Sequence, residues 1–535
     1  MKSIHKVITI LLCVAAIAGC KKSFLDRPSN SQISSTNFYK STSDLRLATA
    51  SLYAGSHWFQ WNTQGYIPLG DVLAGTASFP YNGDLVQLFT RTITAQNGLV
   101  TNGWVGLYNV IAQCNGVINA IQTQADQSIS ASDKNAAIAE AKFIRAVAYY
   151  HLAVYWGAVP IVEDNSKLIK DPLLPRNIVS DVYKFVTKDL TYAAQYLPKT
   201  DTKGRVTTWS AQGMLGKVYL TMAGLGKSGS RDQALLDSAK KYAGNVCHSN
   251  LELFGQLDPN HQGYYNLFKA QNNDSPESLF ALQWAGGVGY GIGNALQQYF
   301  APDGIVTPQG QGGWERIAPS YDLYRMYSAK DTIRRKATIV LTGDFYPELN
   351  AAGGGYIAKN TGLKKHIVGT EKDNNLPTMD SWSSPEHNAI LRLADVYLVY
   401  AEAILGNDGS TSDGDALTYF NKVRTRAGVD KVDVITPALL RTERRVELAF
   451  EGQYWIDLVR YSYYDPTNAV KFLNDQDATH GRISFNYDPK TKIATRDTIA
   501  PPVTLPATIA SFTLPIPSSE LTTDPKLAQP PVPYY

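Results

Sequence analysis

The sequence predicts a mainly α-helical protein in which helix pairs flank an irregular segment rich in aromatic residues. Apolar residues recur at spacings of three and four over most of residues 100–250 and 389–461, as in amphipathic or buried helices. Between them, from about 251 to 388, this periodicity gives way to glycine, asparagine, proline and isolated aromatics. Hydrophobic residues make up 44% and charged residues 18% of the 535 residues, so a large core can form.

The N-terminal part predicts a helix, an aromatic loop and a second helix. Helical spacing covers residues 37–56. The next stretch, 57–83, opens with the letters HWFQW and contains glycine and proline, which indicates a loop. Helical spacing returns over 103–123.

The strongest helical pattern covers residues 131–162. Ser132 is a candidate N-cap, and Gly157 and Pro160 would end the helix. Alanines between its aromatics permit close helix approach, so we expect this helix to be buried on much of its circumference. Further helices are predicted at 177–197, 209–224, 231–247, 389–406, 414–427 and 437–461, before a proline-rich extended tail.

Some of these helices form pairs. Leu215, Gly216 and Tyr219 in one helix, followed by Ala239 and Ala243 in the next, match the tetratricopeptide order of Leu, Gly, Tyr and Ala. Because the match is degenerate and insertions separate the helices, the sequence predicts irregular helix hairpins rather than a regular solenoid.

The N-terminus predicts export and lipidation. A short basic region, an apolar run at 7–17 and small residues form a signal peptide over residues 1–19. The run is shorter than the about 20 residues that span a membrane. Cys20 follows as the first mature residue and completes a bacterial lipobox, so we expect an acyl anchor at Cys20 and a polar tether over 20–35.

Several classes of chemistry find no support. The net charge of +3 does not indicate the strongly basic surface that nucleic-acid-binding proteins carry. The eight histidines form no metal-ligand spacing, and no phosphate loop or Gly-x-Ser-x-Gly motif occurs, so no cofactor or metal is expected. Cys114 and Cys247 could pair in an oxidising compartment, but both lie in helical patterns, which favours buried free thiols.

Charged residues embedded in apolar helices suggest buried ion pairs. Two facing carboxylates could instead act as general acid and base. Since each carboxylate has an arginine nearby, we expect ionised, structural pairs and no enzyme. The residues concerned are Glu140, Arg145, Arg392, Asp395, Glu402, Arg424, Arg426, Glu443, Arg444, Arg445, Glu447, Glu451, Asp457 and Arg460.

Aromatic residues in the irregular segments are the candidate ligand contacts. The chain has 32 Tyr and 9 Trp, side chains on which the apolar face of a sugar ring can stack. On helical patterns, Trp104, Trp156, Trp209 and Trp455 are expected to be core. The candidate ligand-binding residues are Trp58, Trp61, Tyr66, Tyr81, Trp284, Tyr290, Trp314 and Trp382.

Seven stretches in order resemble one known family, the SusD/RagB family of surface nutrient-binding lipoproteins. The resemblance runs nearly end to end. The stretches lie at 22–28 (KSFLDRP), 140–162, 204–220, 390–403, 420–428, 441–461 and 514–521 (LPIPSSEL).

The resemblance implies one α-rich domain over 36–535, with four tetratricopeptide-like helix pairs mainly at 100–250 and 389–461. An irregular ligand-binding lobe would lie mainly at 57–100 and 251–388. It implies a protein without catalytic residues, lipid-anchored at the outer-membrane surface, that binds oligo- or polysaccharide. The glycan would pass to a SusC-like TonB-dependent transporter for import.

Three rival functions stay open. A peptide or glycopeptide could replace the glycan in a member of the same family. A surface glycoside hydrolase would show bond cleavage, and a structural tetratricopeptide adaptor would bind no small ligand and turn its aromatics inward.

Overall fold

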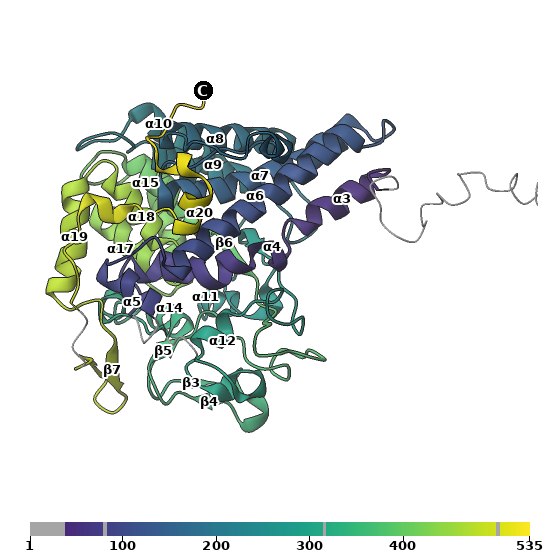
Figure 1. Cartoon of the computed structure of the whole chain (residues 1–535). Coiled ribbons are helices and arrows are strands. Elements are labelled where there is room, and N and C mark those ends of the chain that lie inside the picture. The colour runs from purple at the N-terminus through teal and green to yellow at the C-terminus, as the bar shows by residue number, and fades with distance from the viewer. Residues whose placement is uncertain (1–37, 79–82, 314–316, 499–502) are drawn as a thin grey trace, which may run out of the picture.

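The structure, a computed structural model, describes residues 38–78, 83–313, 317–498 and 503–535. The predicted signal peptide, Cys20 and the tether to residue 35 therefore lie outside the described residues. Figure 1 shows a stack of helices above a lobe of loops, short helices and hairpins. The predicted fold class, a mainly α fold of helix pairs beside an irregular lobe, is confirmed.

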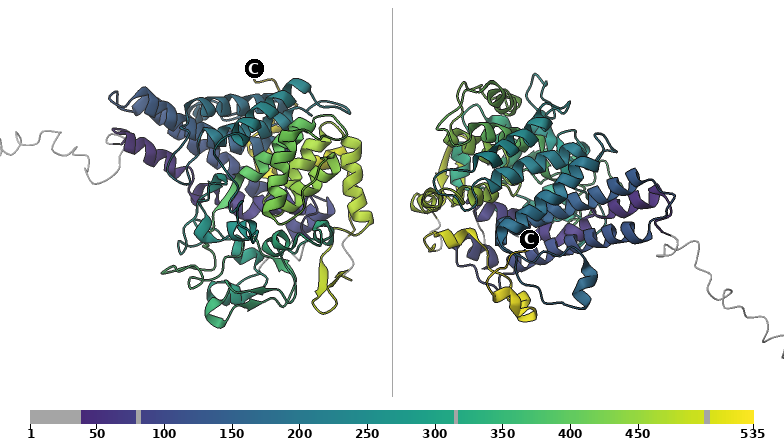
Figure 2. Two further views of the ribbon diagram at one scale, coloured as in Figure 1. Left: turned by 180° about the vertical axis from the view of Figure 1, so that it is seen from behind. Right: turned by 90° about the horizontal axis from the view of Figure 1, so that it is seen from above.

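Seven long helices form the stack, and each packs on the next. Small residues allow this, since a Cβ added to Gly216 would lie 2.9 Å from the Cβ of Ala243 on the neighbouring helix. Figure 2 shows the stack from behind and from above. In spatial order the helices are α6 (Gly98–Gln124), α7 (Ala131–Trp156), α8 (Val179–Tyr196), α9 (Thr208–Met222), α10 (Gln233–Cys247), α15 (Leu393–Leu405) and α16 (Gly414–Arg426).

Helix α7 packs between α6 and α8 and is buried from Ala137 to Trp156 except at Lys142, so it is buried on much of its circumference, as predicted. Its N-cap is Ser130, whose hydroxyl accepts a hydrogen bond from the Asp133 amide at 3.0 Å. The prediction of Ser132 as N-cap is therefore wrong, because two serines lie within reach of the first turn and the helix begins one residue after the earlier one.

Residues 57–72, which we predicted to open a loop over 57–83, are helical. Helix α3 (Thr42–Ser51) is followed by α4 (Gly55–Gln60), by two π-helical segments, η1 (Trp61–Tyr66) and η2 (Pro68–Val72), and by α5 (Gly83–Thr90). Pro68 stands at the first position of the second π segment, where a missing amide proton is tolerated. The proline and glycines within 57–72 that indicated a loop therefore lie within helical turns.

The C-terminal helices also differ in their boundaries. The predicted helix at 389–406 begins as strand β6 (Asn388–Arg392), which pairs antiparallel with β1 (Ser278–Leu282), and α15 starts only after it. The predicted helix at 437–461 is two helices, α17 (Pro437–Glu447) and α18 (Tyr454–Ser462). A further helix, α19 (Pro466–Ala478), was not predicted.

Short elements make up the lobe. Its described strands form two-stranded antiparallel pairs that bring distant loops together. They are β2 (Ile339–Val340) with β5 (Gly362–Leu363), β3 (Phe345–Tyr346) with β4 (Tyr356–Ile357), and β7 (Phe485–Asp488) with β8 (Ile493–Arg496). The short helices are α11 (Gly263–Leu267), α12 (Leu296–Phe300), α13 (Tyr321–Met326), α14 (Thr332–Thr338) and, in the tail, α20 (Ser518–Thr523).

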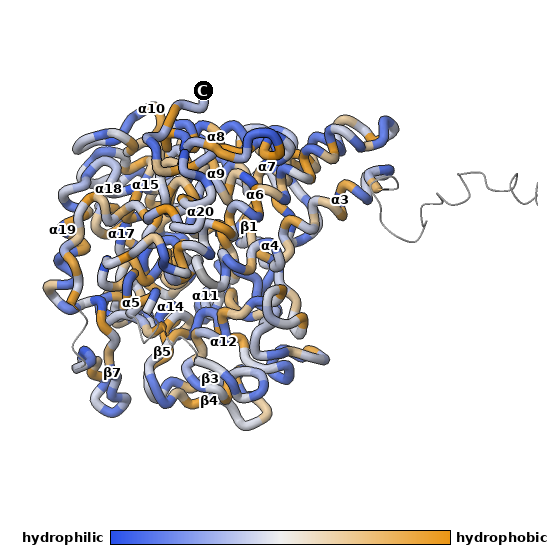
Figure 3. The backbone as a smooth tube through the Cα atoms, viewed as in Figure 1, coloured by the Kyte–Doolittle hydropathy of each residue, from blue (hydrophilic) through white to orange (hydrophobic). Residues whose placement is uncertain are grey.

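One large hydrophobic core runs through the stack and into the lobe, and a smaller one lies beneath β3 and β4. In Figure 3 the turn between α6 and α7 is hydrophilic, as expected of an exposed tip. Trp104, Trp156 and Trp455 are buried and Trp209 packs against the core, as predicted. Cys114 and Cys247 are buried free thiols, which confirms the reading that their helical patterns favoured.

Candidate functional site

Tyr290 is an exposed aromatic residue within the glycine-rich loop between β1 and α12. Gly289 and Gly291 on either side of it have φ angles of 86° and 88°, which favour glycine. The chain therefore turns sharply on both sides of Tyr290. The side chain is 56% exposed, and the nearby Val288 and Ile292 are exposed as well.

A second loop holds this one in place. Asp380 accepts hydrogen bonds from the amide of Gly289 at 3.1 Å and from the amide of Trp382 at 2.9 Å. The Ser383 hydroxyl accepts from the amide of Val288 at 3.0 Å and donates to the carbonyl of Ala285 at 2.9 Å. These bonds fix the two loops in register, so the rings that they carry have a defined separation.

Tyr290 and Trp382 form an aromatic pair at the surface. Their ring centroids are 5.3 Å apart in an edge-to-face arrangement. Phe59 lies against Tyr290 at 4.8 Å, and Tyr299 lies against Trp382 at 5.6 Å. Because Phe59 and Tyr299 are buried and Trp382 is half-buried, the inner rings hold the outer pair rigidly. An arrangement of this kind can receive the apolar face of a ring-shaped ligand.

Three of the predicted ligand contacts lie in the core instead. Trp58 and Trp61 are fully buried and Tyr66 is 1% exposed. The Trp58 indole nitrogen donates to the carbonyl of Leu52, and the Tyr66 hydroxyl donates to the carbonyl of Ala389. The prediction that these three rings receive ligand is wrong, because 57–72 is helical and turns them inward.

The other predicted residues are placed differently. Trp284 is 6% exposed, and its ring lies so close to Gly55 that a Cβ there would be 2.2 Å from it. It therefore supports the loop from beneath. Tyr81 and Trp314 lie outside the described residues. Neither Phe59 nor Tyr299 was singled out from the sequence. Phe59 lies between the predicted Trp58 and Trp61, and Tyr299 lies in the short helix α12.

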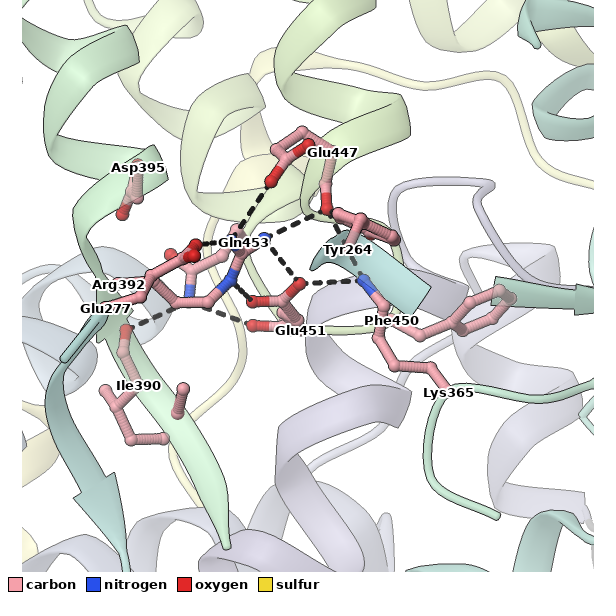
Figure 4. A network of polar contacts seen from close by, with 12 residues as sticks. Tyr264, Glu277, Lys365, Ile390, Arg392, Asp395, Glu447, Phe450, Glu451 and Gln453 are labelled. Carbon is pink, nitrogen blue, oxygen red and sulfur yellow. Dashed lines mark hydrogen bonds and ion pairs between the residues drawn. The ribbon is translucent and has the colours of Figure 1, made fainter. Parts of the chain in front are cut away.

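The predicted buried charges form a dense ionic network, part of which Figure 4 shows. Arg392 binds Glu277 at 2.6 Å, Glu451 at 2.6 Å and Glu447 at 3.0 Å. Lys365 binds Glu451 at 2.7 Å, and Arg426 binds both Glu277 and Glu447. All fourteen charged residues singled out from the sequence have an ion-pair partner, which confirms that prediction. Glu277 and Lys365 were not foreseen because they lie in irregular segments.

Two carboxylates of this network, Glu447 and Glu451, are held ionised. Burial raises the pKa of Glu447, but Arg426, Arg392 and Arg334 outweigh it and lower the pKa to about 2. Burial likewise acts against Glu451, and Arg392 and Lys365 lower its pKa overall. A glycosidase acid must carry a proton near neutral pH, so these carboxylates are suited to structure rather than acid catalysis.

Two further properties concern the described part of the chain. Within it, no group of three or more histidine, cysteine, aspartate or glutamate side chains is arranged to hold a metal ion. None of its helices combines the length and the apolar character needed to cross a membrane.

The fold and this site define a stacked-helix protein that exposes aromatic rings from an irregular lobe. The family model "SusD family" matches residues 333–535, and the model "Starch-binding associating with outer membrane" matches residues 23–220. A SusD-like protein of Bacteroides ovatus is 37% identical over 551 aligned positions, which cover 100% of this chain and 98% of the relative. This chain therefore belongs to the SusD family.

Solved structures agree. A crystal structure with xylogluco-oligosaccharide has a TM-score of 0.84 and 36% identity, and the match covers 92% of this chain and 99% of that one. Surface glycan-binding protein A of Bacteroides thetaiotaomicron, solved with laminarihexaose, has a TM-score of 0.68 at 20% identity, over 90% of this chain and 97% of that one. The second likeness concerns the fold alone.

Proposed function

We propose that this protein captures oligo- or polysaccharide at the bacterial surface and delivers it, uncleaved, to a SusC-like TonB-dependent transporter for import. The observation that carries the proposal is the pair of exposed Tyr290 and half-buried Trp382, held by two hydrogen-bonded loops. The relative solved with xylogluco-oligosaccharide supports this ligand class. Tyr81, Trp284 and Trp314 stay proposed ligand-binding residues.

The test is binding of xyloglucan, laminarin, starch and their oligosaccharides in affinity gels and calorimetry. We expect Tyr290→Ala and Trp382→Ala each to weaken binding by about 1–3 kcal/mol, since a stacked ring is lost. Tyr535→Ala is the matched control, because Tyr535 is also 56% exposed but lies on the C-terminal tail. It should bind as the wild type does.

The rivals predict other outcomes. Binding with release of shortened glycan would support a hydrolase. Binding of peptides and of no glycan would move the proposal to the peptide-binding alternative. If neither class of ligand binds, the adaptor function would be favoured.

The proposed surface location rests on Cys20. An acyl chain there would retain the protein at the outer membrane, so Cys20→Ala should move it from the membrane fraction to the soluble fraction. The stacked helices α6–α10 are the proposed surface for the transporter, because such arrays offer broad binding faces. Copurification of the two proteins in detergent, with and without the anchor, measures this association.

A further inference from the structure

A pocket that is separate from the aromatic pair lies in the lobe, beside the segment that follows α11. Its volume is about 370 Å³, within the range of about 300–1,000 Å³ that small-molecule sites occupy. The walls come from Asn266 and residues 268–272, from Glu348, and from Lys364, Ile367, Val368, Asp373 and Asn374. None of the residues of the aromatic pair lines it.

A buried lysine and a carboxylate face this pocket. The side chain of Lys364 is 8% exposed, and its ammonium donates to the carbonyl of Ile367 at 2.9 Å. Its distance to Glu348 is 3.6 Å, longer than a hydrogen bond. An ammonium group has three N–H donors, so Lys364 has donors to spare among the described residues.

Acceptors face the same space. The Tyr265 hydroxyl donates to Oε1 of Glu348 at 2.6 Å. Burial raises the pKa of Glu348, but Lys364 and Tyr265 lower it overall, so the group is ionised at neutral pH. The side-chain amide nitrogen of Asn374 donates to two carbonyls, of Val368 and Thr370, which fixes that side chain at the edge of the pocket.

The charge balance of the pocket selects the ligand class. Lys269 and Lys364 offset Glu348 and Asp373, so the lining is neutral overall. Asp373 is engaged by the amides of Asn350, Ala351 and Thr370 and serves to hold the loop. A lining that offers both hydrogen-bond donors and acceptors suits hydroxyl groups, because each hydroxyl group donates and accepts. Phe268, Ile367 and Val368 supply an apolar wall for carbon-bound hydrogens.

We propose that this pocket is a second carbohydrate site that binds one neutral sugar ring, with adjacent hydroxyls held by Glu348 and Lys364. It is separate from the aromatic pair, and it does not depend on the function proposed for that pair. The two sites are joined by the segment 373–382, which lines the pocket at one end and carries Trp382 at the other.

The experiment uses the protein from Lys21 onward with Tyr290→Ala and Trp382→Ala, so that binding at the aromatic pair is weakened and the further pocket substitutions report on this pocket. Ligand-detected NMR measures binding of glucose, galactose and xylose, with glucuronate as an anionic comparison. We expect saturable binding of at least one neutral sugar. Glu348→Gln and Lys364→Met should each weaken it by about tenfold or more, as for loss of a hydrogen bond to a charged group.

Lys359→Met is the matched control, since Lys359 is a surface lysine of the same lobe and does not line the pocket. It should bind sugar unchanged. If Lys364→Met fails to fold, as judged by circular dichroism, Glu348→Gln and Gln271→Ala decide the matter. The proposal is overturned if no neutral sugar binds, if glucuronate binds more tightly, or if the pocket variants bind like the control.

Discussion

Asp71 is a fully buried carboxyl group that fixes the turn between α17 and α18. Its two oxygens accept hydrogen bonds from the amides of Phe450 and Gly452, each at 3.0 Å. Burial raises its pKa to about 7, against the bonds from these amides and the charges of Lys365 and His366.

This pKa predicts a loss of stability as pH rises. The folded state keeps the Asp71 proton up to about pH 7, whereas the unfolded chain releases it near 3.8, so the folded state binds more protons between these values. The free energy of unfolding should fall by up to about 4 kcal/mol across that window. Asp71→Asn cannot titrate and should lack this component.

Urea unfolding of both proteins between pH 4 and 8 measures the difference. Burial lowers the pKa of His151 to about 4, so this residue makes the free energy of unfolding rise with pH. The contribution is the same in both proteins and cancels when they are compared. Identical pH profiles for the wild type and Asp71→Asn would contradict the assignment.

Arg426 is fully buried and binds the carboxylates of Glu277 and Glu447. Replacing it with alanine leaves two buried carboxylates without one of their cations. We expect Arg426→Ala to lower the free energy of unfolding by about 3–5 kcal/mol. Lys330→Ala, which removes an exposed ion pair with Asp430, should cost about 0–1 kcal/mol in the same denaturation assay. Equal losses would show that burial does not set the value of the pair.

The sequence alone could not distinguish the buried aromatic residues from the exposed ones at the site. Trp58 and Tyr290 both stand among glycines and aromatics, so residue type did not separate a core ring from an exposed one. The separation depends on whether the local backbone is helical and on which face meets α6, and both are decided by tertiary packing. The pairing of charges was predictable because an unpaired buried charge is too costly to retain.

At the scale of elements, the break between α17 and α18 is the feature that periodicity could not predict. Apolar spacing continues through 437–461, yet α17 ends at Glu447, and Phe450 and Gly452 in the break have φ angles of 59° and 65°. The break lets Asp71 reach two amides and brings Gly70 against Gly452. Helix existence was thus predictable, whereas this boundary follows from contacts with a segment far away in sequence.

Gly452→Ala tests this break. A Cβ at this position would lie 2.8 Å from the ring of Tyr66, and the backbone conformation itself disfavours alanine. We expect a loss of about 1–3 kcal/mol in the free energy of unfolding. Gly409→Ala is the control, since its added Cβ would meet nothing within 4 Å, and it should change stability by about 0.5 kcal/mol or less. Comparable melting temperatures for both variants would contradict the role of Gly452.

At the scale of the whole molecule, the ionic network joins the lobe to the helix stack. Arg426 of α16 binds Glu277 before β1, and Glu443 of α17 binds both Arg424 of α16 and Arg334 of α14. We therefore expect the two parts to unfold together, in one calorimetric transition whose van't Hoff and calorimetric enthalpies agree. Two separate transitions in the wild type would contradict this coupling.

The overall fold class was predictable because helical periodicity and an ordered set of family motifs agree. The spatial order was less so. Helix α15 lies beside α10, although the lobe separates them in sequence, and nothing in the periodicity of either helix specifies its neighbour. The clamped loops that carry Tyr290 and Trp382 likewise depend on side-chain bonds between segments about ninety residues apart.

The depth of the ionic network has a practical consequence for work with this protein. Mobile ions screen charges at the surface but reach buried pairs far less, so added sodium chloride should leave the melting temperature of the scaffold nearly constant. Contacts between exposed charges and a membrane partner would weaken in the same solution. Ionic strength can therefore separate the two kinds of electrostatic contact, and a salt titration tests whether the proposed transporter contact depends on exposed charges while the scaffold stays folded.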